Sequence, residues 1–490
     1  MKRIVLLVVF GMGLCRAATA QEELIREYER FRQQQTREFD DYVSRRNREF
    51  ADFLKQEWKL FQSMQAVERP DEPKPDRAPV APDREIPKVP GPKVEPLPVP
   101  LPDLTPKPIP DLKPDVPDVK PDVLDVIPDA PQPLPQTLEF SFYGNPVSLR
   151  FSDRLKAVPG GITEAQVAAW WERMSAGPYG EFIRELRRSG DALGLNDWGY
   201  YRLTETVAGQ LFADGNARTA FVFYMMKQSG YDVRLGRGEG RLYLLPAFTT
   251  QLYGLPYFLL DGKKYYRLEG DGALYTFGES EAFGTGEAID LSQRHPLAMG
   301  GAVKVRELKL AKFPQLQIRL PYSPDRVAYY NTIPQTDMPV YFSYPMPADT
   351  WQGVYEAFQP LAGKYSLPEF VGILLNFVQT SFAYKTDDGQ FGREKYFYPE
   401  EVVAYPFCDC EDRSVFFACL VRRLTGAEVI GLHYPGHMAT AVCFGELDVP
   451  GDTLVYRGKK YVVCDPTYIN ASVGMTMPQF RTVKPEIVGY

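Results

Sequence analysis

The sequence predicts an α+β protein in which a cysteine-bearing helix packs on antiparallel strands. Between residues 407 and 468, an apolar helical run is followed by segments of alternating polarity. A similar order of helix and strands occurs earlier, over residues 217–268. A helical repeat and a proline-rich stretch precede both regions. We therefore expect two lobes, carried on an N-terminal helix and a spacer.

Length and composition support several domains. A chain of 490 residues is too long for one hydrophobic core, and 44% hydrophobic residues is typical of globular proteins. The formal net charge of -7 offers no concentrated positive charge for phosphate, so we expect no nucleic-acid partner.

Residues 1–20 are expected to be a cleaved signal peptide. A short basic start precedes an apolar run from Ile4 to Leu14 and the small residues 18–20. This run is too short to span a bilayer, and no later stretch is apolar for long enough, so no transmembrane segment is expected in the mature chain. The protein is therefore expected to be exported to the periplasm, the cell envelope or the extracellular space.

Residues 21–68 are predicted to form a long helix with an 11-residue repeat. Aromatic or apolar residues recur in two sets, Tyr28, Phe39, Phe50 and Phe61, and Phe31, Tyr42, Phe53 and Met64. Eleven residues make three turns of about 3.67 residues, so each set stays on one face of the helix. The stripe is expected either to pack on the protein's own domains or to act as a coiled coil. In the second case residues 22–68 self-associate or dock on a partner.

Residues 69–136 are predicted to be a proline-rich disordered linker. Prolines alternate with Asp, Lys and Val, and their fixed φ angles and missing N–H groups oppose helix and sheet. Extended polyproline II is favoured instead, and at ~3.1 Å per residue the spacer reaches on the order of 200 Å.

Residues 137–310 are predicted to form the first lobe and residues 311–490 the second. In the first lobe, Glu164 to Ser175 is expected to be a helix capped by Thr163. A buried helix over residues 217–229 follows. Three strands are expected after it, at Tyr231–Leu235, Arg241–Phe248 and Lys264–Leu268.

The second lobe contains all the cysteines that remain after Cys15 is removed with the signal peptide. They lie between Cys408 and Cys464, and an odd number in an exported protein leaves at least one thiol free or paired with another chain. Such clustering indicates one reactive site, not disulfides distributed along the chain.

Cys410 begins an apolar helix that stops at Gly426, so its sulfur is expected at the positive end of the helix dipole. That position is expected to lower the pKa of the thiol. His437 follows on the second strand after the helix, and Asp465 ends the third. A thiolate can attack a carbonyl, the imidazole can protonate the leaving amine, and the carboxylate can hold the imidazole.

Other interpretations of these residues exist. A cysteine that begins a helix is more often a small buried residue, and a histidine on a strand is usually structural. Cys408, Cys410 and Cys464 with His437 are an alternative zinc set, although paired C-x-x-C spacing is absent. Thiol chemistry without metal or cofactor is the preferred prediction.

The C-terminal region resembles the transglutaminase-like core of the papain-like superfamily, and is close to bacterial transglutaminase-like cysteine proteinases. The resemblance rests on the segments FCDCEDRSVFFACLVRRLTGAEVIG, PGHMATAVCF and KKYVVCDPTY, within about the last hundred residues. It implies Cys410 as nucleophile, His437 as base and Asp465 as orienting acid, with Asp412 capping or bracing the helix. It also implies an enzyme that hydrolyses peptide or amide bonds, or transfers the acyl group to an amine, on a peptide or protein substrate. Cys408 departs from the small residue common in the family and leaves room for a disulfide or an oxidisable pair.

The first lobe is expected to be a degenerate copy of the same domain. Residues 218–221 match residues 413–416, and residues 262–265 match residues 458–461. This alignment sets Gly215 opposite Cys410, Arg241 opposite His437 and Glu269 opposite Asp465. The first lobe then lacks a nucleophile and a base, and a binding role is expected for it. The alternative function for the whole protein is a non-catalytic cell-envelope scaffold or peptide-binding protein with the same fold.

Overall fold

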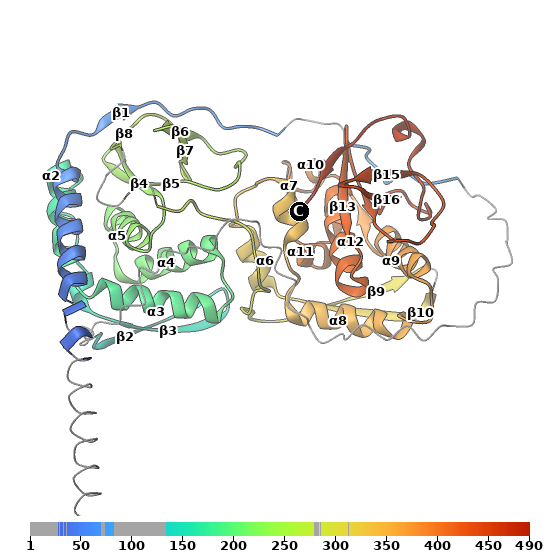
Figure 1. Ribbon diagram of the computed structural model, residues 1–490, viewed down its shortest axis with the longest axis horizontal. Helices are drawn as coiled ribbons and strands as arrows, with labels where there is room; N and C mark the ends of the chain where they lie inside the picture. The colour runs from blue at the N-terminus through green and yellow to red at the C-terminus, as the bar shows by residue number, and fades with distance from the viewer. Residues whose placement is uncertain are drawn as a thin grey trace, which may run out of the picture.

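Two lobes that mix helices with antiparallel sheets lie side by side in the computed structural model of the protein (Figure 1). The structure describes residues 28–69, 74–82, 134–278 and 286–490, apart from residues 29, 33, 36 and 312, together with Gly284. The expected signal peptide and most of the expected linker lie outside the described residues. Within the described ranges, no helix combines the length and the apolar character needed to cross a bilayer.

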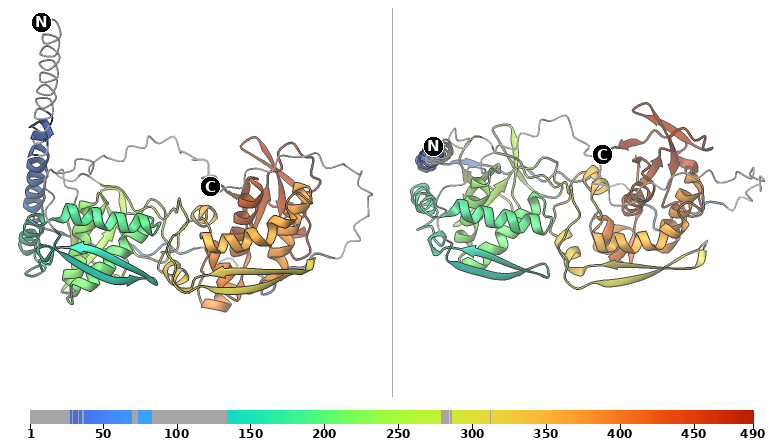
Figure 2. Two further views of the ribbon diagram at one scale, coloured as in Figure 1. Left: turned by 90° about the horizontal axis from the view of Figure 1, so that it is seen from below. Right: turned by 60° about the horizontal axis from the view of Figure 1, so that its bottom comes forward.

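The N-terminal helix lies along one side of the first lobe, and residues 37–54 are continuously helical (Figure 2). Its aromatic stripe divides into two parts. Phe50 is fully buried against Trp171, with ring centroids 4.6 Å apart. Tyr28 and Tyr42 are 61% and 49% exposed. The C-terminal part of the stripe therefore packs on the protein's own lobe.

The helix ends at Leu54, and the prediction that it continues to residue 68 is wrong. β1 (Lys59–Phe61) takes the place of its last turns and pairs antiparallel with β8 (Leu274–Thr276). Just before β1, Trp58 is buried with its ring 5.3 Å from that of Phe277. Strand pairing and the burial of Trp58 outweigh helical periodicity, which is a weak constraint once tertiary partners are available.

The first lobe runs from a hairpin through a set of helices to short strands. Its elements before β8 are β2 (Gln136–Phe142), β3 (Asn145–Phe151), α2 (Glu164–Ser175), α3 (Tyr179–Ala192), α4 (Asp197–Leu211), α5 (Gly215–Gln228), β4 (Val233–Gly238), β5 (Arg241–Pro246), β6 (Tyr257–Leu260) and β7 (Lys263–Tyr266). Thr163 caps α2 by accepting a hydrogen bond from the backbone N–H of Gln166, as predicted. Most of α5 is buried, so this helix lies at the centre of the lobe.

The second lobe packs α12 (Cys410–Thr425) on an antiparallel sheet of order β15-β16-β14-β13-β17. The elements before α12 are β9 (Lys304–Leu310), β10 (Phe313–Tyr322), α6 (Pro324–Tyr330), α7 (Met338–Ser343), α8 (Ala348–Phe358), α9 (Leu367–Ser381), β11 (Ala383–Tyr384), α10 (Asp387–Phe391), α11 (Pro399–Ala404) and β12 (Phe407–Cys408). Those after it are β13 (Val429–Tyr434), β14 (His437–Val442), β15 (Thr453–Tyr456), β16 (Lys459–Cys464) and β17 (Glu486–Val488). α12 ends at Gly426, whose φ of 72° is the left-handed conformation that glycine adopts most readily.

Residues 74–82 belong to the expected linker, yet they lie on the second lobe. The backbone N–H of Ala81 donates to the carbonyl of Ile469 (2.7 Å), and that of Ile469 donates to the carbonyl of Pro79 (2.8 Å). Ala81 is buried in a small apolar cluster with Tyr468. The prediction of disorder is wrong for this segment, because an extended backbone that cannot form a helix can still pair with a neighbouring strand-like loop.

Candidate active site

Cys410 is the first residue of α12, as the sequence predicts. Asp412 braces this end of the helix, because its buried carboxylate accepts hydrogen bonds from the backbone N–H groups of Asp409 (3.2 Å) and Phe397 (2.9 Å). The bond to Asp409 satisfies a donor that the start of a helix leaves without an intrahelical partner. The bond to Phe397 ties the helix to the chain before α11. The position of the Cys410 backbone is therefore held from two sides.

His437 and Asp465 form a direct pair, with Nε2 and Oδ2 2.8 Å apart and both side chains buried. The other oxygen of Asp465 accepts the backbone N–H groups of Thr467 (2.9 Å) and Tyr468 (3.0 Å). Phe480 stacks on the imidazole, with centroids 5.4 Å apart and planes at 3°. The ring of His437 is thus fixed in one orientation.

Gln379 of α9 supports the loop that carries Asp465, a role that was not predicted from the sequence. Its side-chain amide donates to the carbonyls of Asp465 (3.0 Å), Tyr468 (2.8 Å) and Ala471 (3.1 Å). A glutamine in an apolar helix is a signal for such a role, since a buried amide requires partners.

The other imidazole nitrogen of His437, Nδ1, is buried without a hydrogen-bond partner among the described residues. The amino end of α12 lies close to it. Ser414, one turn after Cys410, donates its hydroxyl to the carbonyl of Met438, the residue that follows His437 (3.1 Å). Glu411, which accepts a hydrogen bond from the Cys410 thiol, also raises the pKa of His437 by its charge. The elements that carry Cys410 and His437 therefore pack together, but the described residues show no hydrogen bond between the thiol and the imidazole.

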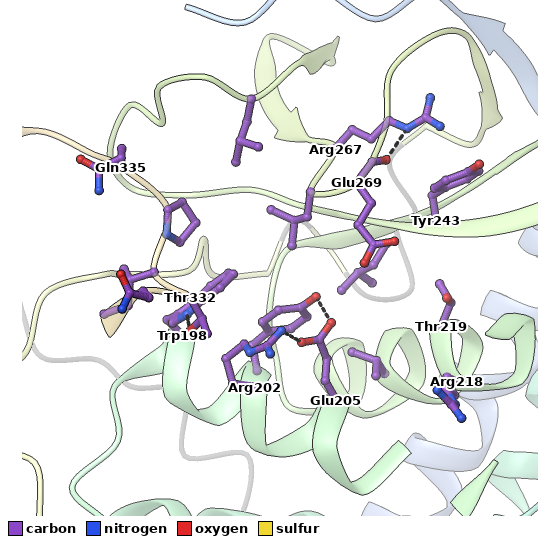
Figure 3. Close-up of a pocket in the computed structure, with 18 of the residues that line it drawn as sticks. Trp198, Arg202, Glu205, Arg218, Thr219, Tyr243, Arg267, Glu269, Thr332 and Gln335 are labelled. Carbon is purple, nitrogen blue, oxygen red and sulfur yellow. Dashed lines mark hydrogen bonds and ion pairs between the residues drawn. The ribbon is translucent and has the colours of Figure 1, made fainter. Parts of the chain in front are cut away.

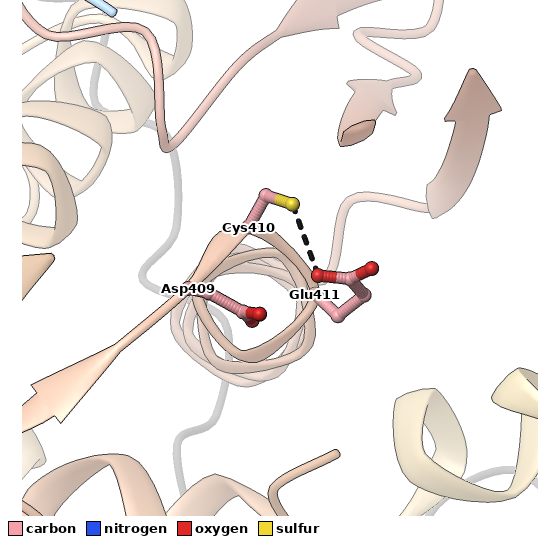
Figure 4. Close-up of side chains that lie close together, drawn as sticks. All are labelled: Asp409, Cys410 and Glu411. Atoms are coloured by element: carbon pink, nitrogen blue, oxygen red, sulfur yellow. Dashed lines mark hydrogen bonds between the residues drawn. The ribbon is translucent and has the colours of Figure 1, made fainter. Parts of the chain in front are cut away.

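The Cys410 thiol itself is bonded to Glu411. Its Sγ donates to Oε2 across 2.9 Å, as the dashed line in Figure 4 shows. Burial raises the pKa of the Cys410 thiol well above its ordinary value, and the charges of Glu411 and Asp409 raise it further. The expected lowering by the helix dipole is wrong for this arrangement, because desolvation and two carboxylates act against the thiolate more strongly. The sulfur is a neutral thiol here.

Lys74 is the unexpected member of the site. Its ammonium group lies 2.5 Å from Glu394, 2.8 Å from Asp409 and 3.0 Å from Glu411, and its side chain is 9% exposed. Burial acts to lower the pKa of Lys74, but these carboxylates outweigh it and raise the pKa, so the group is charged. For Glu411, burial acts to raise the pKa, but Lys74 and the bond from Cys410 lower it to about 2. Nothing in the local sequence links Lys74 to residues more than three hundred positions away.

The residues of the alternative zinc site do not converge. Across the described part of the chain, the groups with ligand atoms within 4.8 Å of one another are Asp409, Cys410 and Glu411, and Asp387, Glu394 and Asp409. Neither group includes Cys408, Cys464 or His437. Lys74 already supplies a positive charge among these carboxylates, which disfavours a metal cation there. The structure contains no disulfide among the five cysteines of the second lobe, which are Cys408, Cys410, Cys419, Cys443 and Cys464. The disulfide considered for Cys408 is therefore not formed.

A separate cavity of about 670 Å³ lies where the two lobes meet (Figure 3). Its lining includes Gly215, Arg241 and Glu269, the positions that the internal alignment sets opposite Cys410, His437 and Asp465. Arg241 and Glu269 form an exposed ion pair at 3.8 Å. This cavity contains arginines and carboxylates but no cysteine or histidine, which suits it for binding polar ligands.

Changing Asp465 to asparagine is expected to lower the pKa of His437. Asparagine keeps an oxygen for the N–H groups of Thr467 and Tyr468, but its amide nitrogen cannot accept the imidazole proton. Burial acts to lower the pKa of His437, and the charge and hydrogen bond of Asp465 outweigh it and raise the pKa above 6.5. The pair therefore stabilises the fold fully below pH 6.5, and this contribution is lost as pH rises through the folded-state pKa.

Urea denaturation of the Asp465→Asn variant checks this expectation. The free energy of unfolding should fall by about 2 kcal/mol near pH 5.5, with a smaller loss near pH 9. An equal loss at both pH values would show that the ionic pair is not the cause.

Comparisons of the chain with models of protein families, with curated proteins and with solved structures each found no match.

Proposed function

We propose that the second lobe is an exported transglutaminase-like thiol enzyme that cleaves or transfers peptide or amide bonds. The observation that carries the proposal is the buried His437–Asp465 pair, which leaves Nδ1 without a hydrogen-bond partner among the described residues. His437 belongs to β14, which packs against α12, the helix that begins at Cys410. An imidazole held by a carboxylate through one nitrogen keeps the other nitrogen available for a proton from a nucleophile.

In the proposed reaction, Cys410 turns from Glu411 towards His437, and Nδ1 takes the thiol proton. The sulfur then bonds to the carbonyl carbon of an amide, and the imidazolium returns the proton to the amine as the carbon–nitrogen bond breaks. Water or a second amine then attacks the thioester and gives a proton to Nδ1; the carbon–sulfur bond breaks, and the departing sulfur takes that proton back from the imidazolium. Asp465 stabilises the imidazolium that forms between these steps.

The proposal includes an internal duplication. In the second lobe, α12 is followed by strands paired in the order β13-β14-β16-β15. In the first lobe, α5 is followed by the antiparallel pair β4-β5, by a bridge from Ala247 after β5 to Tyr265 of β7, and by the β6-β7 hairpin. Gly262 and Gly458 turn the corresponding hairpins with φ values of 79° and 76°. The same order of elements in the two lobes supports a common topology, in which the first lobe has kept a binding role.

A non-catalytic scaffold or peptide-binding protein is the second candidate. It is favoured by the neutral, buried state of Cys410 and by the polar cavity between the lobes. The two candidates differ in the reactivity that they require of one thiol.

Alkylation by iodoacetamide near neutral pH, followed residue by residue with mass spectrometry, separates them. If Cys410 is the nucleophile, it is expected to react about tenfold or more faster than Cys419, because a thiol with a nearby base forms thiolate more readily. Cys419 is the matched control, since it is a buried thiol on the same helix. The fast phase should be lost in Cys410→Ala and kept in Cys419→Ala. Equal, slow reaction of both thiols would favour the scaffold.

A further inference from the structure

The segment 74–82 lies beside the site at both of its ends. At one end, Lys74 contacts the carboxylates around Cys410. At the other, Pro79 and Ala81 pair with Ile469, a few residues after Asp465. The segment therefore extends from the cysteine to the loop that carries the acid, as an extended peptide substrate of a thiol enzyme would.

The surroundings of Lys74 form a pocket for one ammonium group. Asp409 and Glu411 are buried, and Glu394 is 36% exposed at the rim. Asp387 closes the pocket, since it forms an acidic group with Glu394 and Asp409. Burial raises the pKa of Asp387 to about 7, and the charge of Lys74 acts against this rise. Buried carboxylates without a cation are costly, so such a pocket strongly prefers to be filled.

Two further observations distinguish this pocket from a structural ion pair. Its occupant comes from a segment of the proline-rich spacer, more than three hundred residues away from Asp409 along the chain. One oxygen of Asp409, Oδ1, is buried without a hydrogen-bond partner among the described residues. The pocket therefore holds acceptor capacity that Lys74 does not use.

We propose that the acidic pocket of Asp387, Glu394, Asp409 and Glu411 binds a lysine side chain of an extended peptide, and that Lys74 fills it from within the chain. This inference rests on the proposed function and specifies its substrate class. While Lys74 is in place, Cys410 is fully buried and its thiol points to Glu411. The spacer thus limits access to Cys410, and a lysine-bearing peptide that displaces Lys74 increases that access.

Binding of a synthetic fluorescent peptide with the sequence of residues 70–83, PDEPKPDRAPVAPD, tests the pocket. Fluorescence anisotropy is measured with the mature wild-type chain and with Lys74→Met, using this peptide and a second one in which methionine replaces the lysine. The lysine peptide is expected to bind Lys74→Met about tenfold or more tightly than the methionine peptide, because charge-assisted hydrogen bonds are lost with the ammonium group. Wild type should bind the lysine peptide more weakly than Lys74→Met does.

Equal affinities of the two peptides for a folded Lys74→Met chain would contradict the proposal that the pocket binds lysine. If that variant does not fold, Glu394→Gln in the otherwise wild-type chain replaces it, since Glu394 is the most exposed partner of Lys74. This change should raise the alkylation rate of Cys410 several-fold through weaker retention of Lys74, whereas Glu356→Gln, at an exposed helix position, should not. An unchanged rate in Glu394→Gln would contradict the proposal.

The peptide measurement involves no catalysis. If the chain binds the lysine peptide but Cys410 shows no selective reactivity, the lysine pocket is supported and the proposed thiol enzyme is contradicted. If Cys410 is selectively reactive but the chain does not prefer the lysine peptide, the thiol enzyme is supported and the lysine pocket is contradicted.

Discussion

Replacement of Cys410 by alanine is expected to lower the rate of amide cleavage or transfer by about 10³-fold or more. The proposed reaction requires a sulfur that first bonds to the carbonyl carbon and then leaves as a thiolate. Alanine removes that group, while the Asp412 bonds that brace the amino end of α12 go to the backbone of Asp409 and Phe397 and remain. The loss should therefore appear in the rate and not in the stability of the fold.

Incorporation of a fluorescent primary amine into dimethylated casein measures transfer, and peptide release from casein measures hydrolysis. Cys443→Ala is the control, because Cys443 is the least buried of the five free cysteines. It directly follows β14 and packs on an apolar cluster that contains no residue of α12. Activity that persists in Cys410→Ala and matches the wild-type rate would end the proposal of a Cys410 thioester.

Replacement of Glu400 by alanine is expected to destabilise the second lobe by about 3–5 kcal/mol, because it leaves a buried cation without its main partner. Glu400, on α11, is fully buried and accepts hydrogen bonds from Arg326 Nε (2.9 Å) and Nη2 (2.7 Å). It also accepts the backbone N–H of Ser323 (2.8 Å) and the hydroxyl of Tyr330 (3.0 Å). Without it, Arg326 keeps only the partly exposed Asp349 as a charged partner among the described residues.

Chemical denaturation followed by tryptophan fluorescence measures this loss of free energy. Glu356→Ala provides the comparison, because that carboxylate lies on the exposed face of α8 and bonds only to Gln352 among the described residues. Its effect should stay within about 0.5 kcal/mol. A Glu400→Ala variant as stable as the Glu356→Ala control would show that the Arg326 network is not essential to the fold.

Local patterns predicted the elements whose stability depends mainly on neighbours in the sequence. The capped start of α2 at Thr163 and the glycine that ends α12 follow from the backbone groups that helix ends leave unpaired. The alternation of apolar residues placed His437 at the start of β14 and Asp465 after β16 in the correct order. The pairing of these two side chains across 2.8 Å agrees with that order.

The N-terminal helix marks the limit of such patterns. The 11-residue repeat continues through Phe61, but the backbone there pairs with β8. Helical periodicity describes only which residues share a face. The partner that makes a strand more stable than a further helical turn lies more than two hundred residues away.

By itself, the sequence determined the α+β class, the helix that begins at Cys410 and the order in which His437 and Asp465 follow on the strands, because each depends on short-range periodicity and capping. Only the tertiary structure decided the protonation of the thiol and the place of Lys74. Both depend on burial and on charges that distant segments bring together. The position of Cys410 at the start of a helix predicted a lowered thiol pKa, whereas in the folded protein desolvation and the charges of two carboxylates raise that pKa.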